Sequence, residues 1–116
     1  MTRQQLEALL ETEYGTAGEC LFRRYPSFRV YRHGKGGRWF AVLMEIPREK
    51  LGLSGTEPVS VCNVKCDPDL GELLREQRGI YPAYHMNKRH WLSLLICEVE
   101  EEQLRFSLAH SHSLTK

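Results

Sequence analysis

Hydrophobic and polar positions change their period several times along the chain, and each period predicts an element of secondary structure. Near the N-terminus, three leucines recur at helical spacing directly after a capping-box pair formed by Thr2 and Gln5. This pattern predicts a helix over residues 3–13. The helix is expected to end at Gly15, because glycine readily adopts the backbone conformation that terminates a helix.

From position 20 onward the pattern changes to that of strands: residues 28–32 and 59–64 alternate, and residues 39–44 form a nearly unbroken apolar run of strand length. The glycine-rich residues 33–37 are typical of a hairpin turn between two such strands. Residues 47–58 carry two prolines and two glycines, which predicts an exposed connection with one helical turn at 48–51. The strands are expected at residues 20–23, 28–32, 39–44, 59–64 and 90–97.

A second helix is predicted after the fourth strand. Asp67 is a typical N-cap, and Pro68 suits the first helical position because its missing N–H would have no helical partner there. The apolar stripe of this helix is expected to consist of Leu70, Leu73 and Leu74. Gly79 is expected to end the helix.

The last part of the chain completes a fold prediction. Residues 80–86 show no clear period and are expected to be irregular, whereas the glutamates at 100–102 favour the start of a third helix with Leu104, Leu108 and Ser111 on one face. The predicted order is helix, three strands, connection, strand, helix, strand, helix. This order is typical of an α+β two-layer sandwich, in which an antiparallel sheet of about five strands carries helices on one face.

Composition limits the classes of function. The 116 residues suffice for one domain, residues 1–116, and the net charge of +1 excludes a global basic excess. No apolar run approaches the roughly 20 residues of a membrane span, and the first residues lack the apolar core of a signal peptide. A cytoplasmic location is therefore expected, and the four cysteines are expected to be reduced thiols.

One segment carries positive charge without compensation. No acidic residue lies between Cys20 and Met44, whereas six fixed cations do. This basic hairpin is predicted to lie along phosphates, with Tyr31 and Trp39 as stacking surfaces. Alternating arginines are also typical of a solvated face that pairs with acidic helices, in which case the two aromatics belong to the core. The candidate nucleic-acid-binding residues of this segment are Arg23, Arg24, Arg29, Arg32, Lys35 and Arg38.

Residues 84–91 (YHMNKRHW) combine two histidines, two fixed cations, an amide and two aromatics directly before an apolar run. A polar turn that leads into a buried strand is a suitable place for a ligand to meet a rigid scaffold. In the alternative interpretation, Asn87 and His85 bond backbone groups of an irregular turn while Trp91 packs in the core. The candidate ligand-contacting residues are Tyr84, His85, Asn87, Lys88, Arg89 and His90.

Three stretches carry a family resemblance: residues 63–68 (NVKCDP), residues 82–91 (PAYHMNKRHW) and residues 111–114 (SHSL). On these motifs the chain resembles the MmcQ/YjbR family of small bacterial proteins over nearly its whole length. The resemblance implies a CyaY-like, secretion-chaperone-like α/β sandwich and DNA binding through a double-wing arrangement. Ala83 stands where the family often has glycine, and His112 where it often has tyrosine.

The sequence offers no complete catalytic or metal-binding set. The histidine pairs 85/90 and 110/112 lack a zinc spacing. Cys66 precedes a helix start, where a thiol pKa is lowered, but no base is paired with it in the sequence, and a packed thiol is expected. We therefore predict a binding module that is not an enzyme and has no cofactor and no metal.

Three interpretations of the function follow. The first is binding of double-stranded DNA, mostly by phosphate contacts, which requires the two cationic segments to form one positive surface. The second is a chaperone-like protein-interaction module with an apolar sheet face or edge and a protein partner. The third is a small-ligand or enzyme pocket around His85, Asn87 and His90. No membrane contact is expected, and the chain is predicted to be a monomer or weak dimer.

Overall fold

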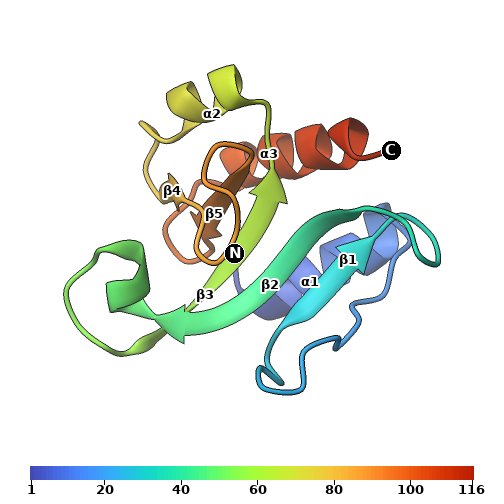
Figure 1. Ribbon diagram of the computed structural model, residues 1–116, viewed down its shortest axis with the longest axis horizontal. Coiled ribbons are helices and arrows are strands. Elements are labelled where there is room, and N and C mark those ends of the chain that lie inside the picture. The colour runs from blue at the N-terminus through green and yellow to red at the C-terminus, as the bar shows by residue number, and fades with distance from the viewer.

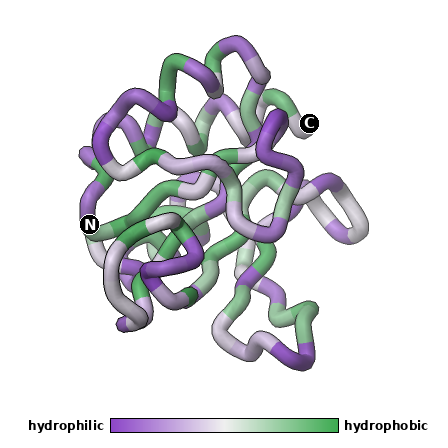
Figure 2. The backbone as a smooth tube through the Cα atoms, turned by 60° about the vertical axis from the view of Figure 1, so that its left-hand side comes forward, coloured by the Kyte–Doolittle hydropathy of each residue, from purple (hydrophilic) through white to green (hydrophobic).

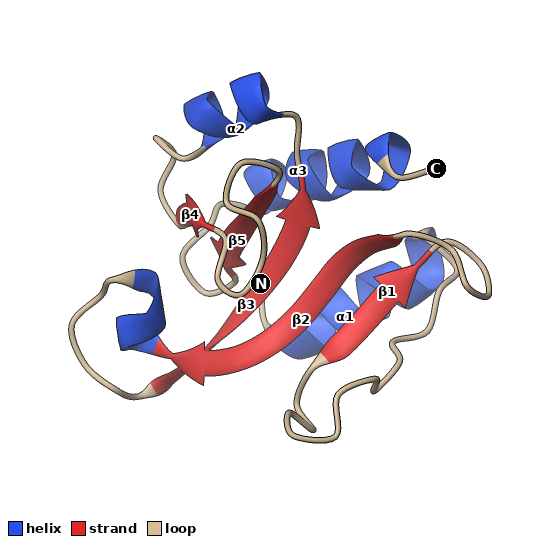
Figure 3. Ribbon diagram, in the orientation of Figure 1, coloured by secondary structure: helices blue, strands red, loops and turns tan.

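A five-stranded antiparallel sheet forms the centre of the structure, a computed structural model that describes residues 1–116 (Figure 1). Its strands lie in the order β1-β2-β3-β5-β4. The strands are β1 (Arg29–Arg32), β2 (Trp39–Pro47), β3 (Pro58–Lys65), β4 (Ile80–Pro82) and β5 (Trp91–Leu95). The helices, blue in Figure 3, are α1 (Arg3–Glu13), the 3-10 turn η1 (Arg48–Leu51), α2 (Pro68–Leu74) and α3 (Glu101–Leu114).

The three α-helices pack on one face of the sheet, where 18 buried residues form the larger core. Leu6 and Leu10 of α1, Leu74 of α2, and Leu104 and Leu108 of α3 all belong to this core, together with apolar residues of every strand except the Pro82 end of β4. Burial of each large apolar side chain stabilises the fold by roughly 1.5–3 kcal/mol. The predicted α+β architecture, with helices on one face of a five-stranded antiparallel sheet, is therefore confirmed.

Several predicted boundaries agree with the structure. The capping box starts α1, because the Thr2 hydroxyl accepts from the Gln5 amide at 3.1 Å and the Gln5 side chain accepts from the Thr2 amide at 2.9 Å. The helical turn η1 lies where it was expected, and a carboxylate oxygen of Asp67 caps α2. However, α2 ends at Leu74 instead of reaching Gly79, and Leu73 is 63% exposed, so it does not belong to the predicted apolar stripe.

Two strand predictions and one core prediction are wrong. Residues 20–23 form no strand, because the segment makes a single bridge between Glu19 and Val30 and then bends through two turns that end at Phe28. The fifth strand is β4, in the stretch that was expected to be irregular. Its three residues are too few to show a period, and they form a strand by pairing with β5. Trp91 is only partly buried and belongs to neither core.

The opposite face of the sheet carries a second, smaller core of seven buried residues. No α-helix covers this open face. It is covered by loops instead, because Phe22 from the loop before β1 and Tyr84 and Met86 from the turn before β5 pack against it. Figure 2 shows the most hydrophobic stretches gathered along the strands in the middle of the molecule, with hydrophilic stretches on the surrounding loops and helix turns. The loops on the open face hold the candidate site.

Candidate functional site

An apolar cleft with a volume of about 320 Å³ hollows the open face of the sheet. We call residues 19–28 the aromatic loop and residues 83–90 the signature turn. Both segments border the cleft, and β2 supplies its remaining surface. The volume lies within the range of ligand sites in proteins. The lining residues are Phe22, Tyr25 and Phe28 from the aromatic loop, Trp39, Val42 and Met44 from β2, and His85 and Met86 from the signature turn.

Aromatic rings form one wall of the cleft. The ring of Phe22 meets that of Trp39 edge-on, at a centroid distance of 5.9 Å and an interplanar angle of 89°. Tyr25 stacks on Phe28 at 4.7 Å and 18°, and its side chain is 44% exposed. Such edge-to-face and stacked pairs favour fixed ring orientations. The wall therefore presents ordered aromatic surfaces to the cleft, and Tyr25 also presents its ring to solvent.

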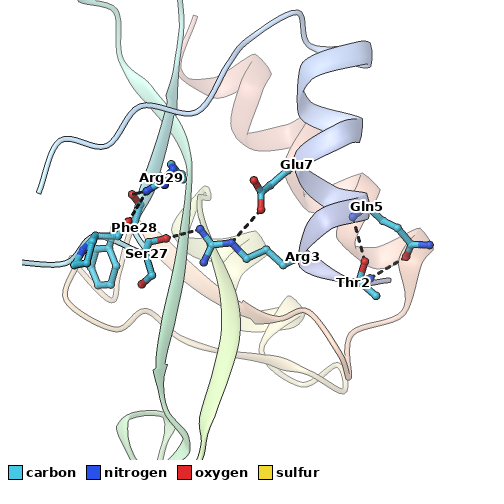
Figure 4. A network of polar contacts seen from close by, with 8 residues as sticks. Thr2, Arg3, Gln5, Glu7, Ser27, Phe28 and Arg29 are labelled. Atoms are coloured by element: carbon cyan, nitrogen blue, oxygen red, sulfur yellow. Dashed lines mark hydrogen bonds and ion pairs between the residues drawn. The ribbon is translucent and has the colours of Figure 1, made fainter.

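Two arginines fix the base of the aromatic loop (Figure 4). The Arg3 guanidinium of α1 donates to the carbonyl oxygen of Ser27 and pairs at 3.2 Å with a glutamate one turn along the helix. Arg29 Nη1 donates to the carbonyl oxygens of Pro26, at 2.5 Å, and Phe28, at 2.9 Å. Hydrogen bonds from charged donors are stronger than neutral ones, so these contacts hold the loop against the helix face and the edge strand.

A buried polar network fixes the signature turn to the sheet. Asn63 of β3 and Ser93 of β5 are opposite each other in the strand register and fully buried. The Ser93 hydroxyl donates to Asn63 Oδ1 at 2.5 Å and accepts from the backbone amide of Tyr84 at 2.9 Å. Asn63 Nδ2 donates to the carbonyl oxygen of Tyr84 at 2.9 Å. Both backbone groups of Tyr84 are therefore bound from beneath, and the turn is held on the open face.

Within the signature turn, two candidate side chains bond to the backbone. Asn87 Oδ1 accepts from the amides of Arg89, at 2.8 Å, and His90, at 3.3 Å, which is the pattern of an asparagine that shapes a turn. The Lys88 amine donates to the carbonyl oxygen of Ala83 at 2.8 Å and so closes the turn across its base. The structural interpretation of Asn87 therefore accounts for its side-chain oxygen.

His85 has a backbone conformation that is unusual for its type. Its φ of 64° is the only positive value outside glycine, and this conformation costs about 1–3 kcal/mol, typically at functional sites. The His85 ring lies 4.0 Å from the Tyr84 ring and 6.1 Å from the Tyr25 ring, so it faces the aromatic loop across the cleft. Of the histidines and asparagine proposed for a small-ligand pocket, only His85 lines the cleft.

The structure divides the predicted cations into occupied and free side chains. Arg32 makes a bidentate pair with Glu19, at 2.7 and 2.8 Å, and Arg29 is bound to backbone carbonyls. Tyr31 is 1% exposed, so it belongs to the core and is no stacking surface, whereas Trp39 lines the cleft. Five predicted cations are exposed and have neither a carboxylate within ion-pair distance nor, unlike Lys88, a hydrogen bond to a backbone carbonyl: Arg23, Arg24, Lys35, Arg38 and Arg89.

Every lining residue comes from one of two segments without acidic side chains, Cys20–Met44 and Gln77–Cys97. The free cations alternate with lining residues in the sequence, since Arg23 and Arg24 lie between Phe22 and Tyr25. Likewise, Arg38 precedes Trp39, and Arg89 follows Met86 by three residues. The fold thus brings both acid-free segments to one cleft, whose lining contains no carboxylate.

Of the twelve predicted site residues, only His85 lines the cleft. Lys35 is in the glycine-rich turn after β1, where the ring of the neighbouring His33 bonds to Thr115 at the end of α3, at 2.8 Å. His90 is partly buried, and its carbonyl oxygen accepts from the amide of Cys66 at 2.8 Å. Tyr84 packs against the smaller core. Most of the predicted set therefore lies outside the cleft lining.

Sequence reasoning did not single out several lining residues. The run FRRYPSFR at positions 22–29 interleaves aromatic residues with arginines, which is a readable signal for a surface that stacks on bases. Met44 and Met86 gave no signal, because a methionine on a strand and another in a turn become neighbours of one cleft only after long-range strand pairing.

The structure also describes the groups considered for metal or thiol chemistry. No three His, Cys, Asp or Glu side chains converge as a metal site requires, and all four cysteines are free. Burial, with a smaller contribution from Asp67, raises the pKa of Cys66 to about 11. This shift is opposite to the lowering that a helix start alone would produce, so Cys66 is a packed thiol. None of the helices has the length and apolar character that crossing a bilayer requires.

Comparison with known proteins adds the family. The YjbR family model matches residues 4–114, which include both segments that border the cleft. The chain belongs to the YjbR family. The uncharacterised protein YyaQ of Bacillus subtilis is 32% identical to it over 117 residues, covering 100% of this chain and 99% of that protein. The family resemblance read from the sequence is therefore confirmed.

Solved structures agree with this YjbR assignment. The crystal structure of a Pseudomonas syringae protein has a TM-score of 0.96 and 37% identity and covers both chains completely. A solution structure from Pseudomonas syringae gives a TM-score of 0.89 over 100% of this chain and 94% of that one. A Deinococcus radiodurans protein with a DUF419 domain, at 22% identity and a TM-score of 0.71 over 97% and 77% of the two chains, shares the fold.

Proposed function

We propose that this YjbR-family protein is a DNA-binding module without catalytic activity, and that the cleft on the open sheet face and its cationic border are the binding surface. The observation that carries the proposal is the meeting of two acid-free segments at one aromatic cleft. A surface that combines uncompensated cations with accessible rings suits a polyanion that also carries flat bases.

The phosphate contacts are assigned to side chains that have no other partner. Arg23, Arg24, Arg38 and Arg89 are exposed, and no carboxylate lies within ion-pair distance of them. A guanidinium without a partner binds phosphate without first losing a salt bridge. Arg32 is left out of this assignment, because phosphate would have to displace Glu19 from a bidentate pair.

Salt dependence tests the proposal directly. Four phosphate contacts predict that duplex affinity falls about a hundredfold between about 50 and 200 mM NaCl, because each contact releases condensed counterions. The measurement is fluorescence anisotropy of labelled duplex and single-stranded oligonucleotides of about 20 nucleotides, a length that exceeds a typical single-domain binding site. If neither form binds at the lowest salt concentration, the proposal is wrong.

A charge-reversal pair shows whether the assigned surface is responsible. The Arg24→Glu, Arg89→Glu double variant reverses one free cation in each of the two loop segments that border the cleft and is expected to weaken binding by about a hundredfold or more. The matched control is Arg78→Glu with Lys116→Glu, which changes the net charge equally at exposed residues that neither line the cleft nor adjoin its lining. Circular dichroism checks that both variants fold. Equal losses in the two variants would contradict the assigned surface.

A further inference from the structure

We infer that the cleft receives an unpaired base, so that the preferred ligand is single-stranded nucleic acid with its backbone on the cationic border. This inference rests on the proposed function and specifies the form of nucleic acid that the same site recognises. It follows from a division of chemistry within the site. The lining is apolar and aromatic apart from His85, whereas the free cations adjoin the lining in sequence and do not belong to it.

The lining selects a flat, uncharged occupant. Trp39, Phe22 and Tyr25 present aromatic surfaces. The methyl groups of Val42 and the thioethers of Met44 and Met86 complete the cleft. A phosphate in this cleft would lose its hydration without gaining a cationic partner. A base has an apolar face that stacks on aromatic rings, and every base offers such a face.

The arginines next to the lining residues favour an occupant whose part outside the cleft is negatively charged. Arg23 and Arg24 separate two lining aromatics in the sequence, and Arg38 directly precedes a third. This alternation of ring and cation matches a nucleotide chain, in which each base is joined to a phosphate. A neutral apolar peptide or a small apolar molecule would fill the cleft but would leave these guanidinium groups without partners, so charge complementarity favours the nucleic acid.

A duplex does not offer the same contact. The faces of paired bases are covered by their stacked neighbours, and extruding one costs a few kcal/mol in unstacking and unpairing. In a single strand the bases are already unpaired, so most of this free-energy cost does not arise. The polar network beneath the signature turn and the arginine contacts of the aromatic loop hold both sides of the cleft in place. Because these walls are fixed, the cleft is expected to favour the unpaired bases of a single strand over a duplex.

The test compares three probes of equal length: oligothymidine, an abasic oligonucleotide with the same phosphate backbone, and a duplex. Anisotropy titrations are expected to show oligothymidine binding about fivefold or more tightly than either of the others, since one stacked base accounts for at least that difference. Equal affinity for all three probes would overturn the inference and leave the proposed function standing. Absence of binding to every probe would overturn the proposed function itself.

Variants locate the base. Tyr25→Ala is expected to weaken oligothymidine binding about fivefold or more and to leave abasic binding unchanged. Its matched control is Phe106→Ala, which removes another exposed ring, 51% accessible, from α3 outside the cleft. In a Trp91→Phe protein, Trp39 becomes the only tryptophan, and its emission is expected to be quenched by oligothymidine but not by the abasic strand. Unchanged emission at saturating oligothymidine would place the base elsewhere and overturn the inference.

Discussion

Ser93 is a small residue on which the geometry of the site depends. Its hydroxyl bonds to both Asn63 Oδ1 and the amide of Tyr84, and all of these contacts lie beneath the signature turn. We expect Ser93→Ala to lower the free energy of unfolding by about 1–3 kcal/mol, because it leaves a buried acceptor and a backbone donor without partners. Urea denaturation measures this loss. Ser113→Ala, at an exposed serine of α3, is the control and is expected to stay within about 0.5 kcal/mol of the parent protein.

Single residues also show where sequence reasoning reached its limit. Arg32 and Arg24 look alike in the sequence, and only the fold shows that the first is neutralised by Glu19, which lies just outside the acid-free segment. The two possible roles of Asn87 were equally compatible with its position, and its hydrogen bonds to the turn show the structural one. What a polar side chain does depends on its partners, and those partners come from the folded structure.

At the scale of elements, the sequence predicted those that local signals determine and missed those that depend on hydrogen bonds between distant strands. The capping box before α1, the prolines around η1 and the glycines after β1 each act within a few residues, and the structure agrees with all three. The strand β4 depends on hydrogen bonds to β5, so its three residues carry no pattern of their own. The aromatic loop has the composition of a strand, but Phe22 and Phe28 pack inward with residues of β2 and the chain bends instead.

The end of α3 meets the turn after β1 through a cluster of rings. The His112 ring lies 4.3 Å from that of His33 and 4.8 Å from those of both Tyr14 and Phe40, and the positive charge of Lys116 also acts on it. Burial, followed by His33 and then Lys116, lowers the pKa of His112 below its ordinary value of 6.5. Protonation of His112 therefore opposes the contact between these two elements.

This shift predicts how stability changes with pH. Below pH 6.5 the unfolded chain binds a proton at His112 more readily than the folded protein does, so stability is fully present above that pH and decreases as the pH falls toward the lowered pKa. His112→Phe keeps a ring among Tyr14 and Phe40 but cannot titrate. We expect thermal unfolding between about pH 7.5 and 5 to show a smaller pH dependence in the variant. Identical pH profiles would contradict the assignment.

Across the whole molecule, opposite charges are separated although the net charge is only +1. The acid-free segments meet at the cleft on the open face, whereas α1 and the start of α3 carry most of the clustered glutamates. Arg105 pairs with Glu13 and Glu101, so part of the positive charge on the helix side is neutralised locally. Such an asymmetry orients an approaching polyanion toward the cleft even when the total charge is small.

Charge and stacking at this face can be separated by one measurement on the intact protein. For single strands, the slope of log affinity against log salt changes by about 0.7 for each phosphate contact. We therefore expect Arg24→Ala to reduce the slope for oligothymidine by about 0.7, and Tyr25→Ala to weaken binding at every salt concentration with the slope unchanged. A stacked ring releases no counterions, whereas an arginine on a phosphate does. Titrations from about 50 to 200 mM NaCl give both quantities. If Tyr25→Ala changed the slope as much as Arg24→Ala, the ring would act through the position of the neighbouring arginines, and the division between an apolar cleft and a cationic border would be wrong.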